Sequence, residues 1–115
     1  MIKINNLTKK FGKLLAVDNV SFCVEENECF ALLGLNGAGK TTLINMLSTQ
    51  LTPTSGTCEL FGFDLIKQKN EIRKIINISP QESACAKNLT VRENLELIAN
   101  LYDTENKKDK IDKII

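Results

Sequence analysis

One stretch constrains the fold of this chain more than any other, a glycine-rich run over residues 34–42. In order, it reads Gly34-Leu35-Asn36-Gly37-Ala38-Gly39-Lys40-Thr41-Thr42, which fits the pattern of a glycine, four residues, and then glycine, lysine and serine or threonine. Glycines in this pattern turn backbone N–H groups toward a phosphate because they accept positive φ and carry no Cβ. Lys40 would reach the β- and γ-phosphates of a nucleotide, and the Thr41 hydroxyl would ligate Mg²⁺. We call residues 34–42 the phosphate loop.

The residues on either side of the phosphate loop make the motif more specific. Residues 29–33 form an apolar run typical of a strand that is buried on both faces of a parallel sheet. After the loop, Leu43, Met46 and Leu47 recur at helical spacing, which predicts a helix that starts at the loop. The N-terminal end of such a helix aims a positive dipole at a bound phosphate. Strand, loop and helix in this order disfavour the alternative of a glycine-rich turn with a solvated lysine.

The length and charge of the chain narrow the possible classes of protein. With 115 residues, the chain can bury roughly two-thirds of its unfolded surface, which suffices for one small domain. A net charge of +1 provides no strong field for nucleic acid or for an anionic membrane. No apolar run approaches the ~20 residues needed to cross a bilayer, and the N-terminus lacks the apolar stretch of a signal peptide. We therefore expect a cytosolic chain.

The cysteines and histidines narrow the chemistry further. The four cysteines are Cys23, Cys29, Cys58 and Cys85, and no two of them have the C-x-x-C spacing of a metal or redox site. Buried or spare reduced thiols are the expected state in a cytosolic chain. The sequence contains no histidine, so a histidine-based site within these residues is excluded.

The pattern of apolar residues predicts a small antiparallel layer beside a parallel core. Residues 2–7 and 20–24 alternate apolar and polar side chains, as half-buried strands do, and we expect them to pair antiparallel. A further short strand is expected over 57–61. Residues 75–79 are apolar enough for a second strand of the parallel core, which Pro80 would stop.

The C-terminal part of the sequence predicts helices and a loop. A short helix is expected over 70–74, and the polar residues 81–88 are expected to form a loop. Thr90 and Glu93 have the spacing of a capping box, in which each side chain bonds the backbone N–H of the other residue. The charged tail over 103–113 is expected to be a solvated helix face or a frayed end. One face of the helix after Thr90 carries Leu95, Ile98, Ala99 and Tyr102.

Four segments together resemble the N-terminal part of an ATP-binding cassette domain, the motor domain of ABC transporters. The resemblance covers about residues 2–102, and the order and spacing of the four segments make it specific. In chain order they are Leu7-Thr8-Lys9-Lys10-Phe11-Gly12, similar to the family's aromatic loop; residues 36–43, the cassette form of the phosphate loop; Leu51-Thr52-Pro53-Thr54-Ser55-Gly56 with a short strand after it; and Ser79-Pro80-Gln81, similar to the Q-loop, with Leu89-Thr90-Val91-Arg92-Glu93-Asn94-Leu95 after it.

The resemblance implies an α/β fold, a P-loop NTPase core with a small antiparallel β layer. It implies that residues 1–80 form the β layer and the core, and that 81–115 form the Q-loop and the start of a helical subdomain. Phe11 would stack on the adenine of ATP, and Thr41 and Gln81 would approach Mg²⁺. The nucleotide-binding residues would be Phe11, Gly34, Leu35, Asn36, Gly37, Ala38, Gly39, Lys40, Thr41, Thr42 and Gln81.

Plainer roles remain open for some of these residues. Phe11 would instead be an ordinary packing residue, and Gln81 a surface loop residue, if the resemblance did not hold at those positions. Glu82 stands beside Gln81, but a solvated glutamate is expected there rather than a catalytic base.

Two departures from the family pattern matter. Asn27 stands where the family usually has glycine, and it preserves the turn over 25–28 because asparagine tolerates positive φ. The second departure is an absence: the sequence has no Leu-Ser-Gly-Gly-Gln signature, no apolar Walker B strand ending in Asp-Glu, and no switch histidine. In the family these follow the part that this chain resembles, so we expect a cassette truncated before them.

The expected function is that of an ATP-binding subunit, or a fragment of one, that binds Mg-ATP to power an ABC transporter and cannot hydrolyse ATP alone. The resemblance implies two partners, a transmembrane permease subunit or domain and a second cassette that completes a nucleotide-sandwich dimer, and no nucleic acid. It implies a cytoplasmic location at the inner face of the membrane through the permease. The alternative is a stand-alone nucleotide-binding module without turnover, regulatory or completed by another chain. A phosphate-loop kinase is disfavoured because nothing resembles an acceptor site.

Overall fold

The chain divides into two compact units, Met1–Ile78 and Ser79–Ile115. The computed structural model describes residues 1–35, 37–79 and 85–115. Two of the predicted nucleotide-binding residues, Asn36 and Gln81, lie outside the described residues, as does Glu82.

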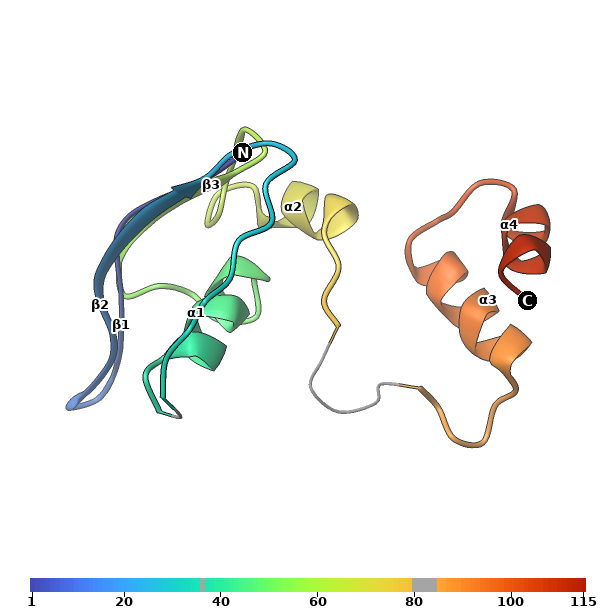
Figure 1. Cartoon of the computed structure of the whole chain (residues 1–115), viewed down its shortest axis with the longest axis horizontal. Coiled ribbons are helices and arrows are strands. Elements are labelled where there is room, and N and C mark those ends of the chain that lie inside the picture. Colours follow the sequence, from blue (N-terminus) through green and yellow to red (C-terminus); the bar gives the residue numbers. More distant parts are fainter. Residues whose placement is uncertain (36, 80–84) are drawn as a thin grey trace. The chain divides into compact units, whose positions relative to one another are not determined.

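The first unit is built on an antiparallel sheet with the strand order β2-β1-β3-β4. Figure 1 labels its three longer strands, β1, β2 and β3. Its long hairpin confirms the predicted antiparallel layer, but both strands run further than the alternating pattern indicated. The alternation of apolar and polar residues breaks where the pairing of β1 with β2 shifts register. Asn6 and Asn19, beside these shifts, have positive φ of 48° and 47°. The four strands are β1 (Ile2–Phe11), β2 (Leu14–Val24), β3 (Ser55–Leu60) and β4 (Phe63–Asp64).

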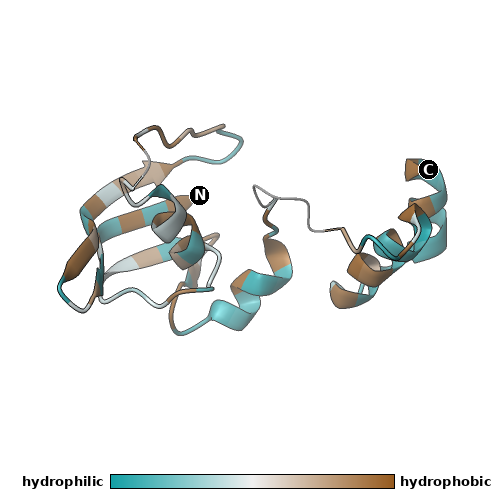
Figure 2. Cartoon of the chain, turned by 90° about the horizontal axis from the view of Figure 1, so that it is seen from below, coloured by the Kyte–Doolittle hydropathy of each residue, from teal (hydrophilic) through white to brown (hydrophobic). Residues whose placement is uncertain are grey.

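Two helices complete this unit, α1 (Lys40–Leu47) and α2 (Lys69–Ile75). Both confirm the predicted helices, α1 with its start at the phosphate loop. The strands show alternating apolar and polar residues (Figure 2), so that one face of the sheet supplies a core that the helices cover. The fully or nearly fully buried core residues are Ile4, Leu7, Val17, Leu43, Met46, Cys58, Leu60, Leu65 and Ile72.

The second unit is a pair of helices, α3 (Val91–Leu101) and α4 (Lys107–Ile114). The predicted capping box begins α3: the Thr90 hydroxyl accepts a hydrogen bond from the Glu93 N–H at 3.2 Å, and the Thr90 N–H donates to the Glu93 carboxylate at 2.7 Å. The part of the charged tail from Lys107 onward forms α4, and its Ile111 is buried. An Arg92–Asp112 ion pair of 2.7 Å joins the two helices. None of the helices that the structure describes is both long and apolar enough to span a bilayer.

The two predicted strands of a parallel core are wrong in the structure. Residues 29–33 form no strand, and Leu33 is 92% exposed rather than buried. Ile75 is the last residue of α2, and residues 76–79 have no regular structure. A strand requires backbone hydrogen bonds to a neighbour, and all strand pairing within 1–35, 37–79 and 85–115 is among β1 to β4. Apolar composition alone therefore does not make these segments strands.

Candidate functional site

The described part of the phosphate loop has the backbone that the motif predicts. Gly37 and Gly39 have φ of 85° and 89°, a region that side chains with a Cβ rarely enter. Between the two glycines, the Ala38 N–H donates to the Leu35 carbonyl at 3.1 Å. Gly39 is the N-cap of α1, and its carbonyl accepts the first helical hydrogen bond from Leu43 at 2.9 Å. The loop thus ends at a helix N-terminus, where free N–H groups and the helix dipole favour an anion.

Gly39 also packs closely on strand β2. A Cβ at this position would overlap the backbone carbonyl of Ala16, and it would lie 3.3 Å from a methyl group of Val17. At Gly37, by contrast, a Cβ would meet no atom within 4 Å. Only the second of the two glycines is therefore required by packing as well as by its backbone angles. Neither Ala16 nor Val17 could be selected from the sequence, because their role depends on a contact with a distant loop.

The ammonium group of Lys40 folds back over the loop. Its Nζ donates hydrogen bonds to the carbonyl oxygens of Gly34 and of Leu35, the latter at 3.3 Å. These hydrogen bonds place the ammonium group against the first two residues of the phosphate loop. Thr41 is exposed on the first turn of α1, and Thr42 beside it is half-buried. A cation beside a helix N-terminus and an exposed threonine on the first turn of that helix fit the phosphates of a nucleotide, and the Thr41 hydroxyl would be a ligand for its Mg²⁺.

Phe11 lies at the end of β1, opposite Leu14 across the hairpin, with its side chain 46% exposed. This end of the hairpin and the phosphate loop lie at the same end of the first unit (Figure 1). Leu15 pairs with Lys10 in the hairpin, and the next residue, Ala16, contacts Gly39 of the phosphate loop. An exposed aromatic ring so placed has the property that stacking on a nucleobase requires.

Lys9 is a neighbour of this ring that the sequence did not reveal. Its Nζ lies 5.2 Å from the centroid of the Phe11 ring and donates a hydrogen bond of 2.7 Å to the Thr52 carbonyl. Thr52 is 43 residues away from Lys9 along the chain. No local pattern in the sequence signals this contact.

The segment that leads into the phosphate loop is attached to β2 by an aromatic pair. The rings of Phe22 and Phe30 stack with their centroids 4.8 Å apart and an angle of 4° between their planes. Asn27, in the turn between them, has φ of 60°, which confirms the positive φ predicted for that position. The loop is thus supported on β2 at two places, through Phe22 before the loop and through Ala16 at its end.

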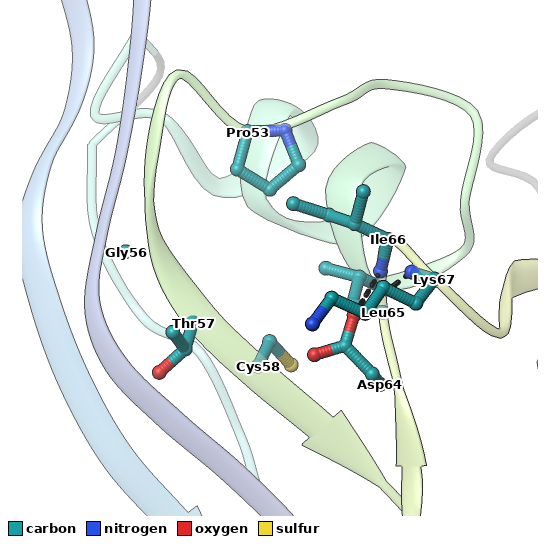
Figure 3. Close-up of a pocket in the computed structure, with 8 residues that line it drawn as sticks. All are labelled: Pro53, Gly56, Thr57, Cys58, Asp64, Leu65, Ile66 and Lys67. Atoms are coloured by element: carbon teal, nitrogen blue, oxygen red, sulfur yellow. Dashed lines mark hydrogen bonds between the residues drawn. The ribbon is translucent and has the colours of Figure 1, made fainter.

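A pocket of about 220 Å³ lies between β3 and the turn after β4, and none of the residues that line it is a predicted site residue (Figure 3). Burial, together with the nearby carboxylates of Asp64 and Glu59, raises the pKa of the Cys58 thiol to about 12. The backbone N–H groups of Lys67 and Ile66 bond the Asp64 carboxylate at 2.8 and 2.9 Å and lower its pKa. Cys58 is therefore an unreactive neutral thiol. All four cysteines are free, and the other three are exposed.

A model of a protein family described as ABC transporter matches residues 17–115. The bacitracin transport ATP-binding protein BcrA of Bacillus licheniformis is 39% identical over 115 residues, which are 100% of this chain and 37% of that protein. The probable multidrug ABC transporter ATP-binding protein YbhF of Escherichia coli (strain K12) is 40% identical over 102 residues, 89% of this chain and 18% of that protein. The chain thus spans well under half the length of these curated relatives.

Solved structures agree with the sequence relatives. The structure of an ATP-binding subunit of an ABC transporter superposes with a TM-score of 0.82 at 28% identity, covering 91% of this chain and 44% of that one. The dimeric post-hydrolysis state of the ATP-binding cassette MJ0796, bound to ADP and Pi, superposes with a TM-score of 0.79 at 26% identity, covering 98% of this chain and 55% of that one. These neighbours confirm the predicted α/β fold class of a P-loop NTPase.

Proposed function

The chain belongs to the ABC transporter family, and on that premise we propose that it is an ATP-binding subunit, or part of one, that binds Mg-ATP to power transport across a membrane. One observation carries this proposal more than any other. Gly37 and Gly39 have positive φ and lead into the N-terminus of α1, and the Lys40 ammonium lies against the loop carbonyl of Gly34. This is the arrangement that a triphosphate requires.

The proposal assigns a part of the nucleotide to each group. Residues 34–42 hold the phosphates, and Lys40 exchanges its contacts with the loop carbonyls for contacts with the β- and γ-phosphate oxygens. The hydroxyl of Thr41 ligates Mg²⁺, and Gln81 approaches the same ion. Phe11 stacks on the adenine. Bound Mg²⁺ supplies charge neutralisation between the phosphates, while the chain supplies position and dipoles.

The organisation and the partners are part of the same proposal. We infer that residues 1–80 act as the β layer and phosphate-loop core, and that 81–115 act as the Q-loop and the start of a helical subdomain. The partners are a transmembrane permease and a second cassette. Through the permease, the chain is located in the cytoplasm at the inner face of the membrane. The related cassette MJ0796 is dimeric in its ADP- and Pi-bound structure, which supports the second partner. The small net charge supports the absence of nucleic acid among the partners.

The proposal is tested by calorimetric titration of the purified chain with Mg-ATP and Mg-ADP. Lys40→Ala should weaken ATP binding by about 1.5–3 kcal/mol, the scale of a charged hydrogen bond, and should weaken ADP binding less. Phe11→Ala should weaken both by roughly 1–3 kcal/mol, because the stacked base is common to them. Equal Lys40→Ala losses for ATP and ADP would contradict the role given to the loop. A wild-type chain that binds neither nucleotide would contradict the proposed function.

A further inference from the structure

A lysine holds the exposed ring at the end of β1. The Lys9 ammonium lies 5.2 Å from the centroid of the Phe11 ring, and its hydrogen bond to the Thr52 carbonyl measures 2.7 Å. Lys9 is half-buried, whereas Lys10 beside it is exposed. The cation is therefore fixed at two points, an aromatic face and a backbone oxygen, rather than solvated freely.

The backbone near the Thr52 carbonyl is itself well anchored. The Thr54 N–H donates to the Thr8 carbonyl at 2.9 Å, and the Thr54 hydroxyl accepts from the Lys10 N–H at 3.0 Å. These bonds join β1 to the connection that follows α1. The Thr52 carbonyl, which accepts the hydrogen bond from Lys9, thus belongs to a segment that other hydrogen bonds already attach to β1.

This geometry has a consequence for the ring. An exposed phenylalanine near a hairpin turn would otherwise sample several rotamers, and ordering it on binding would cost part of the stacking energy. A cation over one face attracts the ring quadrupole and occupies that face. The opposite face is then the one presented for stacking.

We propose that Lys9 is a positioning residue for the nucleobase, holding the Phe11 ring through the ammonium that the Thr52 carbonyl fixes, so that a base stacks on the face opposite the ammonium. This inference rests on the proposed function, in which Phe11 meets the base. Lys9 touches the ring and not the phosphates, so its effect depends on a base being present. Without the ammonium, the Phe11 ring would be ordered on binding instead of beforehand, and this ordering cost corresponds to a ~2–5-fold weaker affinity.

The experiment compares two ligands on matched variants of the purified chain. Mg-ATP carries a base, while inorganic tripolyphosphate with Mg²⁺ presents the same phosphate groups without one. The variants are Lys9→Met, Lys9→Arg and the control Lys10→Met, which removes an equal charge from the next residue and leaves the backbone bond of Lys10 in place. Dissociation constants are measured by calorimetry, with a thermal melt to verify that each variant is folded at the titration temperature.

Lys9→Met is expected to raise the ATP dissociation constant ~2–5-fold relative to Lys10→Met and to leave the tripolyphosphate constant unchanged. Lys9→Arg should restore most of the affinity, because guanidinium also binds aromatic faces. In a Phe11→Ala background, Lys9→Met should cause no further loss. A purely structural role would instead lower the melting temperature and weaken both ligands alike.

The outcomes separate this inference from the proposed function. If Phe11→Ala weakens ATP binding but Lys9→Met and Lys10→Met behave alike, the inference is overturned and the proposed function stands. If Lys9→Met weakens tripolyphosphate as much as ATP, Lys9 acts by charge or by stability, and the inference is again overturned. If wild-type chain binds no ATP, or if Phe11→Ala binds it fully, the stacking role fails and the inference fails with it.

Discussion

At the scale of single residues, the two described glycines of positive φ in the phosphate loop are not equivalent. Gly37 has the backbone angle that favours glycine but open space where a Cβ would be. Gly39 has the same type of angle, and its α-carbon also faces the Ala16 carbonyl at a distance that leaves no room for a Cβ. The backbone of β2 therefore sets how closely the loop approaches the sheet.

This difference predicts unequal effects of alanine at the two positions. Gly37→Ala should cost on the order of 1–2 kcal/mol of folding free energy, the penalty of a left-handed alanine. Gly39→Ala should cost clearly more, because the Ala16 backbone must also move, and it should weaken nucleotide binding more strongly. Urea unfolding together with ATP titration measures both quantities. Equal losses for the two variants would show that the Ala16 contact does not constrain the loop.

Residue-level features were predictable where they depend on local geometry. The motif indicated positive φ in the loop, and Asn27 was expected to tolerate it, because both properties follow from the residue type. The contacts of Gly39 with Ala16 and of Lys9 with Thr52 were not predictable. Each joins residues far apart in the sequence, and no period or spacing records such a pair.

At the scale of elements, the helix starts were predicted better than the core strands. The capping box of α3 is encoded by two residues at a fixed spacing, and the structure forms both of its hydrogen bonds. The strands expected over 29–33 and 75–79 depend instead on neighbours elsewhere, since an extended apolar segment becomes a strand only when another one pairs with it. The sequence pattern reports burial preference, not pairing.

The capping box gives a prediction for α3 that includes its pH dependence. Thr90→Ala removes the acceptor for the Glu93 N–H and should destabilise α3 by about 1 kcal/mol, while Thr90→Ser, which retains the hydroxyl, should not. The Thr90 N–H, and then its hydroxyl, lower the pKa of Glu93. The carboxylate therefore stabilises the helix above the unfolded pKa of ~4.3, and this stabilisation is lost as the pH falls through the lower folded pKa. Hydrogen exchange of the α3 amides, followed against pH, measures both effects. Identical protection in Thr90→Ala and wild type would contradict the capping role.

At the scale of the whole molecule, several large apolar residues of the first unit remain exposed, most of them in or just before the phosphate loop. Leu33 and Leu35 are 92% and 85% exposed, and Phe30 and Ile75 are about half exposed. Large exposed apolar side chains that are close in the sequence, as Phe30, Leu33 and Leu35 are, favour association. We therefore expect the purified chain to associate as its concentration rises and to melt with low cooperativity.

Sedimentation velocity over a range of concentrations tests this expectation. Leu33→Asn should reduce association with little effect on the melting temperature, because the side chain makes few contacts to lose. Leu14→Asn, at the hairpin end and 65% exposed, is the control for a general gain in solubility. A monodisperse wild-type monomer with a sharp melt would contradict the prediction and favour the stand-alone nucleotide-binding module.

The last prediction concerns turnover, and it follows from what the chain brings to the γ-phosphate. Hydrolysis needs a phosphate cradle, a metal, a positioned water and stabilisation of the transferring group. The loop glycines and Lys40 form the cradle, and Thr41 offers a metal ligand. The 115-residue sequence contains no histidine and no apolar run ending in Asp-Glu, the pattern that would supply a base to activate water.

We therefore expect the purified chain to bind Mg-ATP without useful hydrolysis. The lack of a positioned base alone typically lowers the rate by ~10²–10⁴-fold, and a site open to water loses more. Phosphate release is measured with Mg²⁺ and ATP, alongside Lys40→Ala, which controls for contaminating ATPases because it impairs the cradle and nothing else in the preparation. Phosphate release that is the same in both proteins would be contamination. Release that Lys40→Ala abolishes would mean that a base acts from within these residues, and the charged side chains nearest the loop would then have to be tested one by one.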